Sequence, residues 1–100
     1  EGVKINVMEE LVAEETTRQL KAYPPRITKD VKNLDVITYA LNRLPPLYAS
    51  SEEGIAYQTE IAKDIHQRTI KMAVQQAIAA VRRDPLRNTT PIQSKNQNSG

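Results

Sequence analysis

The stretch from Glu52 to Arg83 contains no proline and only one glycine, and it constrains the fold more than any other part of the chain. The preceding "SSEE" predicts its start: either Ser50 caps the helix together with Glu53, or Ser51 caps an acidic first turn. One helix over this stretch would be about 45 Å long at 1.5 Å per residue. That is long for a chain of 100 residues.

Two proline pairs divide the chain before this helix, because a proline ends a helix and disfavours helical geometry in the residue before it. The pairs are Pro24–Pro25 and Pro45–Pro46. Asn6, with a glutamate three residues later, is typical of a capping box and predicts a first helix from about Val7 to Ala22.

A second helix is predicted from Leu34 to Leu44, with Asn33 as its cap. The polar connector "RITKDVKN" between the first two helices has room for a short turn. Together with the long segment, this predicts an all-α domain of about three helices with a long C-terminal helix.

Each helix has an apolar arc at 100° per residue. In the first it consists of Val7, Met8, Leu11, Val12 and Ala22. Glu15 falls inside that arc, either as a boundary residue whose stem packs or as a carboxylate kept for a partner. In the second the arc consists of Leu34, Val36, Ile37, Ala40, Leu41 and Leu44, and the opposite side carries Asp35, Thr38, Tyr39 and Asn42. The simplest interpretation of that opposite side is a solvated face without a functional role.

The apolar arc of the long helix is wider than two short helices can cover, because Ile70, Val74 and Val81 extend it past half the circumference. We therefore expect a second copy of the chain to cover the excess, so that the protein is a homodimer. The remaining polar strip carries Tyr57, Asp64, Arg68, Lys71, Gln75 and Arg82.

The net charge of +2 is an average over two unlike parts. Residues 1–81 contain ten Lys and Arg against eleven Asp and Glu, whereas residues 82–100 contain four against one. A near-neutral folded part makes a nucleic-acid partner an unfavoured expectation. No membrane span is expected either, because no run of about 18 apolar residues exists. Residues 84–100 are polar and include two prolines, which predicts a disordered tail.

Known catalytic signatures are missing from the sequence, which has no P-loop, GxGxxG, HExxH or nucleophile elbow. There is no cysteine, which excludes disulfides and thiolate metal sites and fits a reducing compartment. The single histidine, His66, lies at the edge of the long helix's apolar arc and is interpreted as a packed or interface residue. We therefore expect no enzyme, no metal and no cofactor.

The segment "NRLPPLYASS" has the chemistry of a nucleotide pocket. Its prolines hold the flanking side chains in a stiff frame. Arginine can pair with phosphate or with the O6/N7 edge of guanine, tyrosine can stack on a base, and the next helix begins with free N–H groups that favour phosphate. The alternative is a purely structural corner between two helices, and the residues alone leave both open.

The sequence "DVITYALNRLPPLYASSEEG", preceded by "NVMEELV", closely resembles the late competence development protein ComFB family in its cyanobacterial branch. The resemblance covers about residues 6–81, and we expect a helical domain over residues 6–83 after an N-terminal extension of residues 1–5. It implies a cytoplasmic, dimeric, all-helical receptor for cyclic di-GMP, or for cyclic di-AMP, that regulates cell size, competence or motility through a protein partner. The zinc-type cysteines of Bacillus-type members are missing here, so no zinc role is implied.

The motif does not specify the ligand contacts, so we assigned them by chemistry. We expect phosphate or the guanine O6/N7 edge to be bound by Arg26, Lys29 and Arg43. We expect the N–H groups at guanine N1 and N2 to donate to Asp30 and Asp35. Tyr48 would stack or bond a phosphate, and Asn42, Ser50 and Ser51 would supply hydrogen bonds. The rival hypothesis is a protein-interaction module of the competence system that binds no nucleotide.

Overall fold

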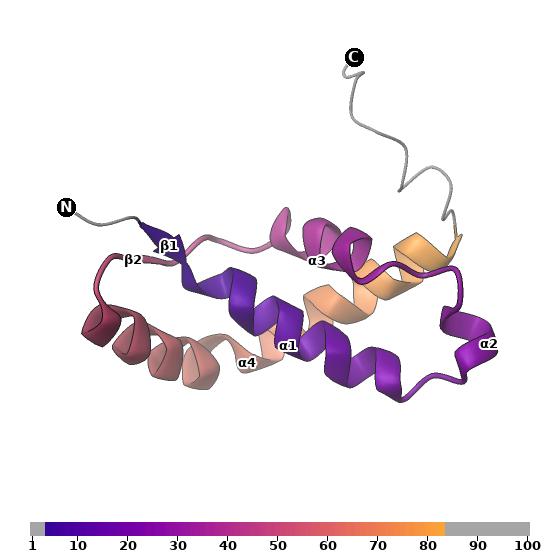
Figure 1. Ribbon diagram of the computed structural model, residues 1–100, viewed down its shortest axis with the longest axis horizontal. Coiled ribbons are helices and arrows are strands. Elements are labelled where there is room, and N and C mark those ends of the chain that lie inside the picture. The colour runs from indigo at the N-terminus through magenta and orange to yellow at the C-terminus, as the bar shows by residue number, and fades with distance from the viewer. Residues whose placement is uncertain (1–3, 84–100) are drawn as a thin grey trace, which may run out of the picture.

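The computed structural model describes residues 4–83, and the predicted tail at residues 84–100 lies outside them. Helices make up most of this part, as predicted, with a long helix at its C-terminal end (Figure 1). The elements, in chain order, are β1 (Ile5–Asn6), α1 (Val7–Lys21), α2 (Pro25–Thr28), α3 (Asn33–Leu41), β2 (Tyr48–Ala49) and α4 (Glu52–Arg83). The described part therefore has four helices instead of about three, because the polar connector forms the short helix α2.

Helix α1 begins where the sequence predicts. Asn6 is its N-cap, and the side-chain Oδ1 accepts a hydrogen bond from the backbone N of Met8 at 3.1 Å. The helix ends at Lys21, three residues before the first proline of the Pro24–Pro25 pair. Pro25 then takes the first position of α2, where its missing N–H removes no helical hydrogen bond.

Helix α3 differs from the prediction at both ends. Its N-cap is Lys32 instead of Asn33, and no side chain bonds the first turn. It ends at Leu41, and turns follow over Asn42 and Arg43 before Pro45. Leu34, which we placed on the apolar arc, is 71% exposed, because the side of this segment that faces the core is formed by Val36, Ala40 and Leu44.

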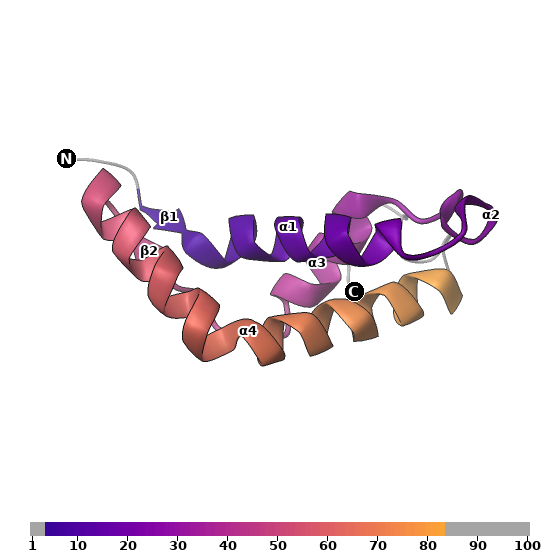
Figure 2. The same ribbon diagram turned by 90° about the horizontal axis from the view of Figure 1, so that it is seen from below.

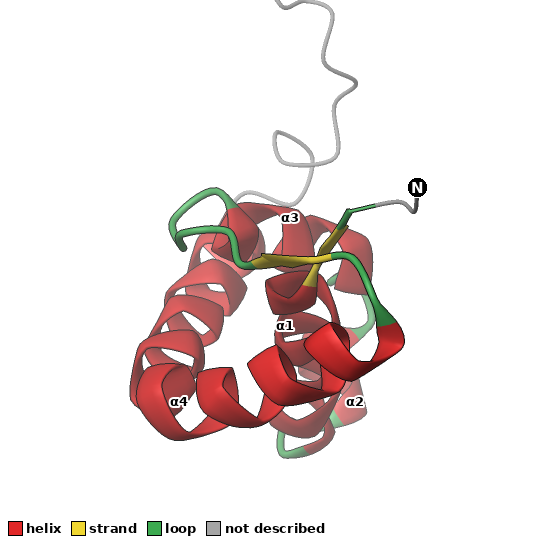
Figure 3. Cartoon of the chain, turned by 90° about the vertical axis from the view of Figure 1, so that its left-hand side faces the viewer, coloured by secondary structure: helices red, strands yellow, loops and turns green. Residues whose placement is uncertain are grey.

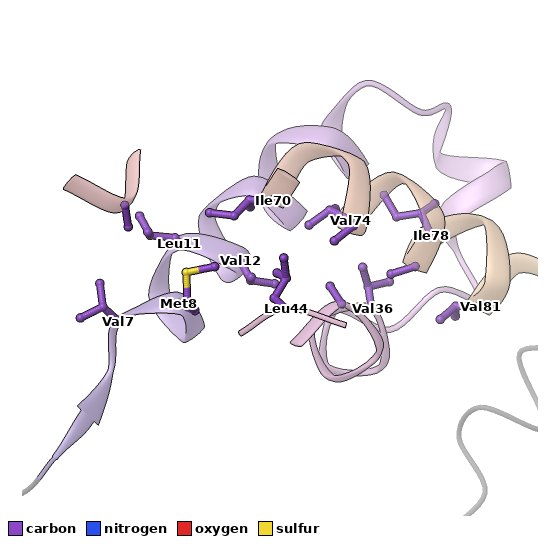
Figure 4. Close-up of a cluster of buried hydrophobic side chains, with 14 residues drawn as sticks. Val7, Met8, Leu11, Val12, Val36, Leu44, Ile70, Val74, Ile78 and Val81 are labelled. Carbon is purple, nitrogen blue, oxygen red and sulfur yellow. The ribbon is translucent and has the colours of Figure 1, made fainter. Parts of the chain in front are cut away.

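The core lies between α1, α3 and the C-terminal half of α4 (Figure 4). In Figure 4 Val12 from α1 and Val36 from α3 point toward Ile70, Val74 and Ile78 of α4. Leu44, just beyond α3, fills the space between them and is 8% exposed. The side chains are aliphatic throughout the buried set, apart from Met8 and Thr16.

Helix α4 is bent, so its two halves have different surroundings (Figure 2). Its buried residues are Ala62, Ile70, Ala73, Val74, Ala77, Ile78, Ala80 and Val81, and only Ala62 belongs to the N-terminal half. Ile70, Val74 and Val81 are thus covered within one chain, and our inference that these residues need a second copy was wrong. The homodimer itself stays a prediction, and it now depends on exposed residues such as Ile65, which is 67% exposed.

Two short strands, absent from the prediction, join the beginning of the chain to the corner after α3. Strands β1 and β2 pair antiparallel, with Ile5 opposite Ala49 and Asn6 opposite Tyr48. Figure 3 shows them crossing beside the N-terminal end of α1. Ile5, which we assigned to an extension, is therefore part of the fold. In the part that the structure describes, no helix is both long and apolar enough to cross a membrane.

Candidate functional site

The corner, defined here as residues 42–51, is held to the start of α1 by two hydrogen bonds of the Leu47 backbone. Asn6 Oδ1 accepts from the backbone N of Leu47 at 2.9 Å as well as from Met8. The backbone N of Val7 donates to the carbonyl oxygen of Leu47 at 2.7 Å. Because Pro45 and Pro46 also fix the backbone just before Leu47, the corner is a rigid frame.

Arg43 is the best-positioned cation of this frame. Its guanidinium carbon lies 3.7 Å from the centroid of the Tyr39 ring, which is cation–π geometry. A weak hydrogen bond of 3.4 Å from Nη1 of Arg43 to the carbonyl oxygen of Tyr39 adds to it. Arg43 is exposed, whereas Tyr39 is half-buried against the core. A stacked guanidinium keeps its N–H edge free to bind an anion or a guanine edge.

Tyr39 is the residue that our assignment missed. We placed it on the polar side of its helix and gave it no role. The four-residue spacing between Tyr39 and Arg43 brings two side chains together on a helix face, so this spacing was a usable signal.

The other corner residues are presented to solvent or used in the fold. Asn42, Tyr48 and Ser50 are exposed, and the Tyr48 side chain is 56% exposed. Ser51 is the cap of α4, because its Oγ accepts from the backbone N of Gly54 at 3.0 Å. Of the two caps left open by the sequence, the structure thus has Ser51.

The N-terminus of α4 is a poorer phosphate site than its free N–H groups suggest. Ser51 already bonds one of those groups. The first turn also carries Glu52 and Glu53, both exposed, whose carboxylates compensate the helix dipole and repel an anion. The geometry therefore favours Arg43 over this helix end as the phosphate contact.

Asp35 lies in the first turn of α3, at the opposite end of that helix from Arg43. The side chain is half-buried, and its Oδ2 is buried without a hydrogen-bond partner. A buried acceptor is normally bonded, so this oxygen lacks the partner that a buried carboxylate ordinarily has. Asp35 and Arg43 thus lie near opposite ends of α3, which is about 13 Å long for its nine residues.

Arg26, Lys29 and Asp30 do not join the corner within one chain. Arg26 belongs to α2 and Lys29 is its C-cap. Figures 1 and 2 both place α2 at the opposite end of the molecule from β2, with α1 spanning the distance. A helix of 15 residues is about 22 Å long, so one ligand in one chain cannot contact both groups.

A hollow of about 560 Å³ lies elsewhere, between α1 and the bent middle of α4. Glu15 faces it and is bonded by both Arg18 and Gln19 of its own helix. Gln19 Nε2 also donates to the carbonyl oxygen of Lys71 at 3.0 Å, which ties α1 to α4. The Glu15 carboxylate therefore has partners within the chain, as expected of a boundary residue.

Comparison with protein-family models gives one family. The model described as late competence development protein ComFB matches residues 5–85. The chain belongs to the ComFB family. The match includes β1, all four helices and the corner, so it covers the fold and the candidate site together. No curated protein matches the chain.

Proposed function

We propose that this ComFB-family protein is a non-enzymatic cytoplasmic receptor for a cyclic dinucleotide. The ligand is cyclic di-GMP or cyclic di-AMP, and the signal passes to a protein partner that controls cell size, competence or motility. Membership of a competence-related family supports this proposal. The observation that carries it is the exposed guanidinium of Arg43, stacked on Tyr39 within a rigid corner.

The chemistry of the corner suits a nucleotide. Arg43 can pair with a phosphate or with the O6/N7 edge of guanine, because a stacked guanidinium loses little entropy on binding. Tyr48 offers an exposed ring on which a base can stack. Asn42 and Ser50 are exposed hydrogen-bonding groups in the same frame, and the half-buried carboxylate of Asp35 is assigned to the guanine N–H groups.

The residues on α2 fit this site only through a second copy of the chain. A cyclic dinucleotide has two-fold symmetry, so a symmetric dimer can present matching groups to its two halves. In that arrangement Arg26, Lys29 and Asp30 of one copy approach the corner of the other. Within one copy the site consists of Asp35, Asn42, Arg43, Tyr48 and Ser50, with Tyr39 as support and Ser51 as the cap.

Titration calorimetry with cyclic di-GMP and cyclic di-AMP tests the proposal. Arg43→Ala should weaken binding about ten- to a hundredfold, because it removes a charged hydrogen bond. Arg68→Ala is the matched control, since Arg68 is an exposed cation on α4 outside the corner. Both variants should remain helical by circular dichroism.

Unchanged binding in Arg43→Ala, with a loss in Arg68→Ala, would move the pocket to the strip between Tyr57 and Arg68. No heat with either nucleotide would leave the second candidate, a protein-interaction module. The exposed Tyr57 and Ile65 on the N-terminal half of α4 favour that alternative.

A further inference from the structure

Charge is unevenly distributed along the molecule, although the described residues are close to neutral. Helix α1 has Glu9 and Glu10 in its first turn and Lys21 as its last residue. Helix α4 has Glu52 and Glu53 in its first turn and Arg82 and Arg83 as its last residues. Figures 1 and 2 show both helices ending on the side where α2 lies. One end of the molecule is thus acidic and the other basic.

The basic end combines cations from three elements. It consists of Lys21, Arg26, Lys29, Arg82 and Arg83, and all five are exposed. Asp30 is the one carboxylate within residues 21–32. None of the five cations makes an ion pair with another residue in the 4–83 range. Arg82 lies 5.4 Å from the centroid of the Tyr23 ring, which holds the end of α4 beside the loop after α1.

Compensation of helix dipoles explains only some of these charges. Lys21, Arg82 and Arg83 stand at the C-terminal ends of long helices, where cations are stabilising. Arg26 and Lys29 belong to a four-residue helix, which has only a small dipole to compensate. They bring further positive charge to an end where every unpaired cation repels the others. An external anion would relieve that repulsion.

Apolar groups lie between these cations. Pro24 and Pro25 are exposed, and Tyr23 and Ile27 are half-buried. A protein segment with alternating acidic and apolar residues matches such a surface, since its carboxylates and its apolar side chains both find partners. Nucleic acid fits less well: its exterior offers no apolar side chains, and the half-buried Tyr23, already beside Arg82, provides no free stacking platform.

We infer that the basic end is the docking surface for an acidic, partly apolar segment of a protein partner. This inference rests on the proposed function in one respect: the partner is the protein through which the proposed receptor acts. The surface lies about the length of α1 away from the corner of the same chain. Its cations Lys21, Arg82 and Arg83 have no part in the proposed nucleotide site.

Fluorescence anisotropy with a labelled peptide of alternating glutamate and leucine tests the inference without any nucleotide. The full chain should bind the peptide, and binding should weaken as salt is raised. Lys21→Glu/Arg83→Glu should lower the affinity about tenfold or more, because two attractions become repulsions. Lys4→Glu/Arg68→Glu changes the net charge equally at exposed sites outside the basic end and should bind like the parent.

Equal losses in the two double variants would overturn the inference, because they would show attraction to net charge alone. Tighter binding of a short DNA duplex than of the peptide would also overturn it and identify a nucleic-acid surface. Arg43→Ala should keep peptide binding, and Lys21→Glu/Arg83→Glu should keep nucleotide binding, because Lys21 and Arg83 have no part in the proposed nucleotide site. Loss of nucleotide binding in the latter would make the basic end part of the nucleotide site. If no nucleotide binds at all, the peptide result still decides the inference.

Discussion

At the residue scale, a single side-chain oxygen connects the start of α1 to the corner. Asn6 Oδ1 caps α1 through Met8 N and holds Leu47 N of the corner. The capping pattern predicted the first bond from local sequence alone. The second joins residues 41 positions apart, so no local pattern could reveal it.

Asn6→Ala should lower the free energy of unfolding by about 2 kcal/mol, because it removes a helix cap and leaves Leu47 N without its acceptor. Urea denaturation followed by circular dichroism measures this. Asn6→Asp keeps the acceptor oxygen and should lose much less. Similar losses in the two variants would mean that the amide nitrogen, and not Oδ1, is the stabilising group.

Arg43 depends on Tyr39 for its position. Tyr39→Leu should weaken cyclic dinucleotide binding about two- to fivefold, the expected worth of an exposed cation–π contact. Tyr39→Phe keeps the ring and should bind like the parent. Calorimetry on the three proteins decides this, and equal binding by Leu and Phe variants would show that the ring does not position Arg43.

At the scale of elements, α4 joins two environments in one continuous helix. Its C-terminal half is covered by α1 and α3, whereas Ala62 is the one buried residue of its N-terminal half. The helix length followed from the missing prolines and from the "SSEE" start. The sequence did not show which apolar residues of α4 the chain itself covers, because that depends on the bend of α4 and on how closely α1 and α3 pack against it.

The same distinction explains the other differences from the prediction. Helix α1 was predictable because Asn6 and the proline pair mark both its ends. The polar connector has weak local signals, so neither α2 nor its distance from the corner could be read from the sequence. Pairing of β1 with β2 involves two residues per strand, too few for an alternating pattern to show.

Ile78→Ala should destabilise the protein by about 2–5 kcal/mol, because Ile78 is fully buried between α4 and its neighbours and its loss leaves a cavity. Met72→Ala, on the same half of α4 but 50% exposed, should cost far less. Thermal and urea unfolding compare the two. A small effect for Ile78→Ala would contradict the packing of the core.

At the scale of the whole molecule, two features favour a second copy of the chain. The N-terminal half of α4 is not covered within one chain, and the residues assigned to the nucleotide lie at two separate places on one chain. Ile61 and Ile65 are four residues apart on one face of this half, and Ile65 is 67% exposed. A second copy on this face would bury them. The proposed nucleotide site requires, in addition, that the dimer bring α2 of one copy to the corner of the other.

We therefore expect light scattering at micromolar concentration to give twice the chain mass of 11.3 kDa. Ile65→Asp should produce monomers and raise the dimer dissociation constant at least about a hundredfold. The reason is that a symmetric interface loses the burial of this side chain twice, at about 1.5–3 kcal/mol each. Gln67→Asp, an exposed position about 200° around the helix from Ile65, should remain dimeric. A monomeric parent would contradict both the interface and the shared site, whereas a dimer that tolerates Ile65→Asp would place the interface on another face.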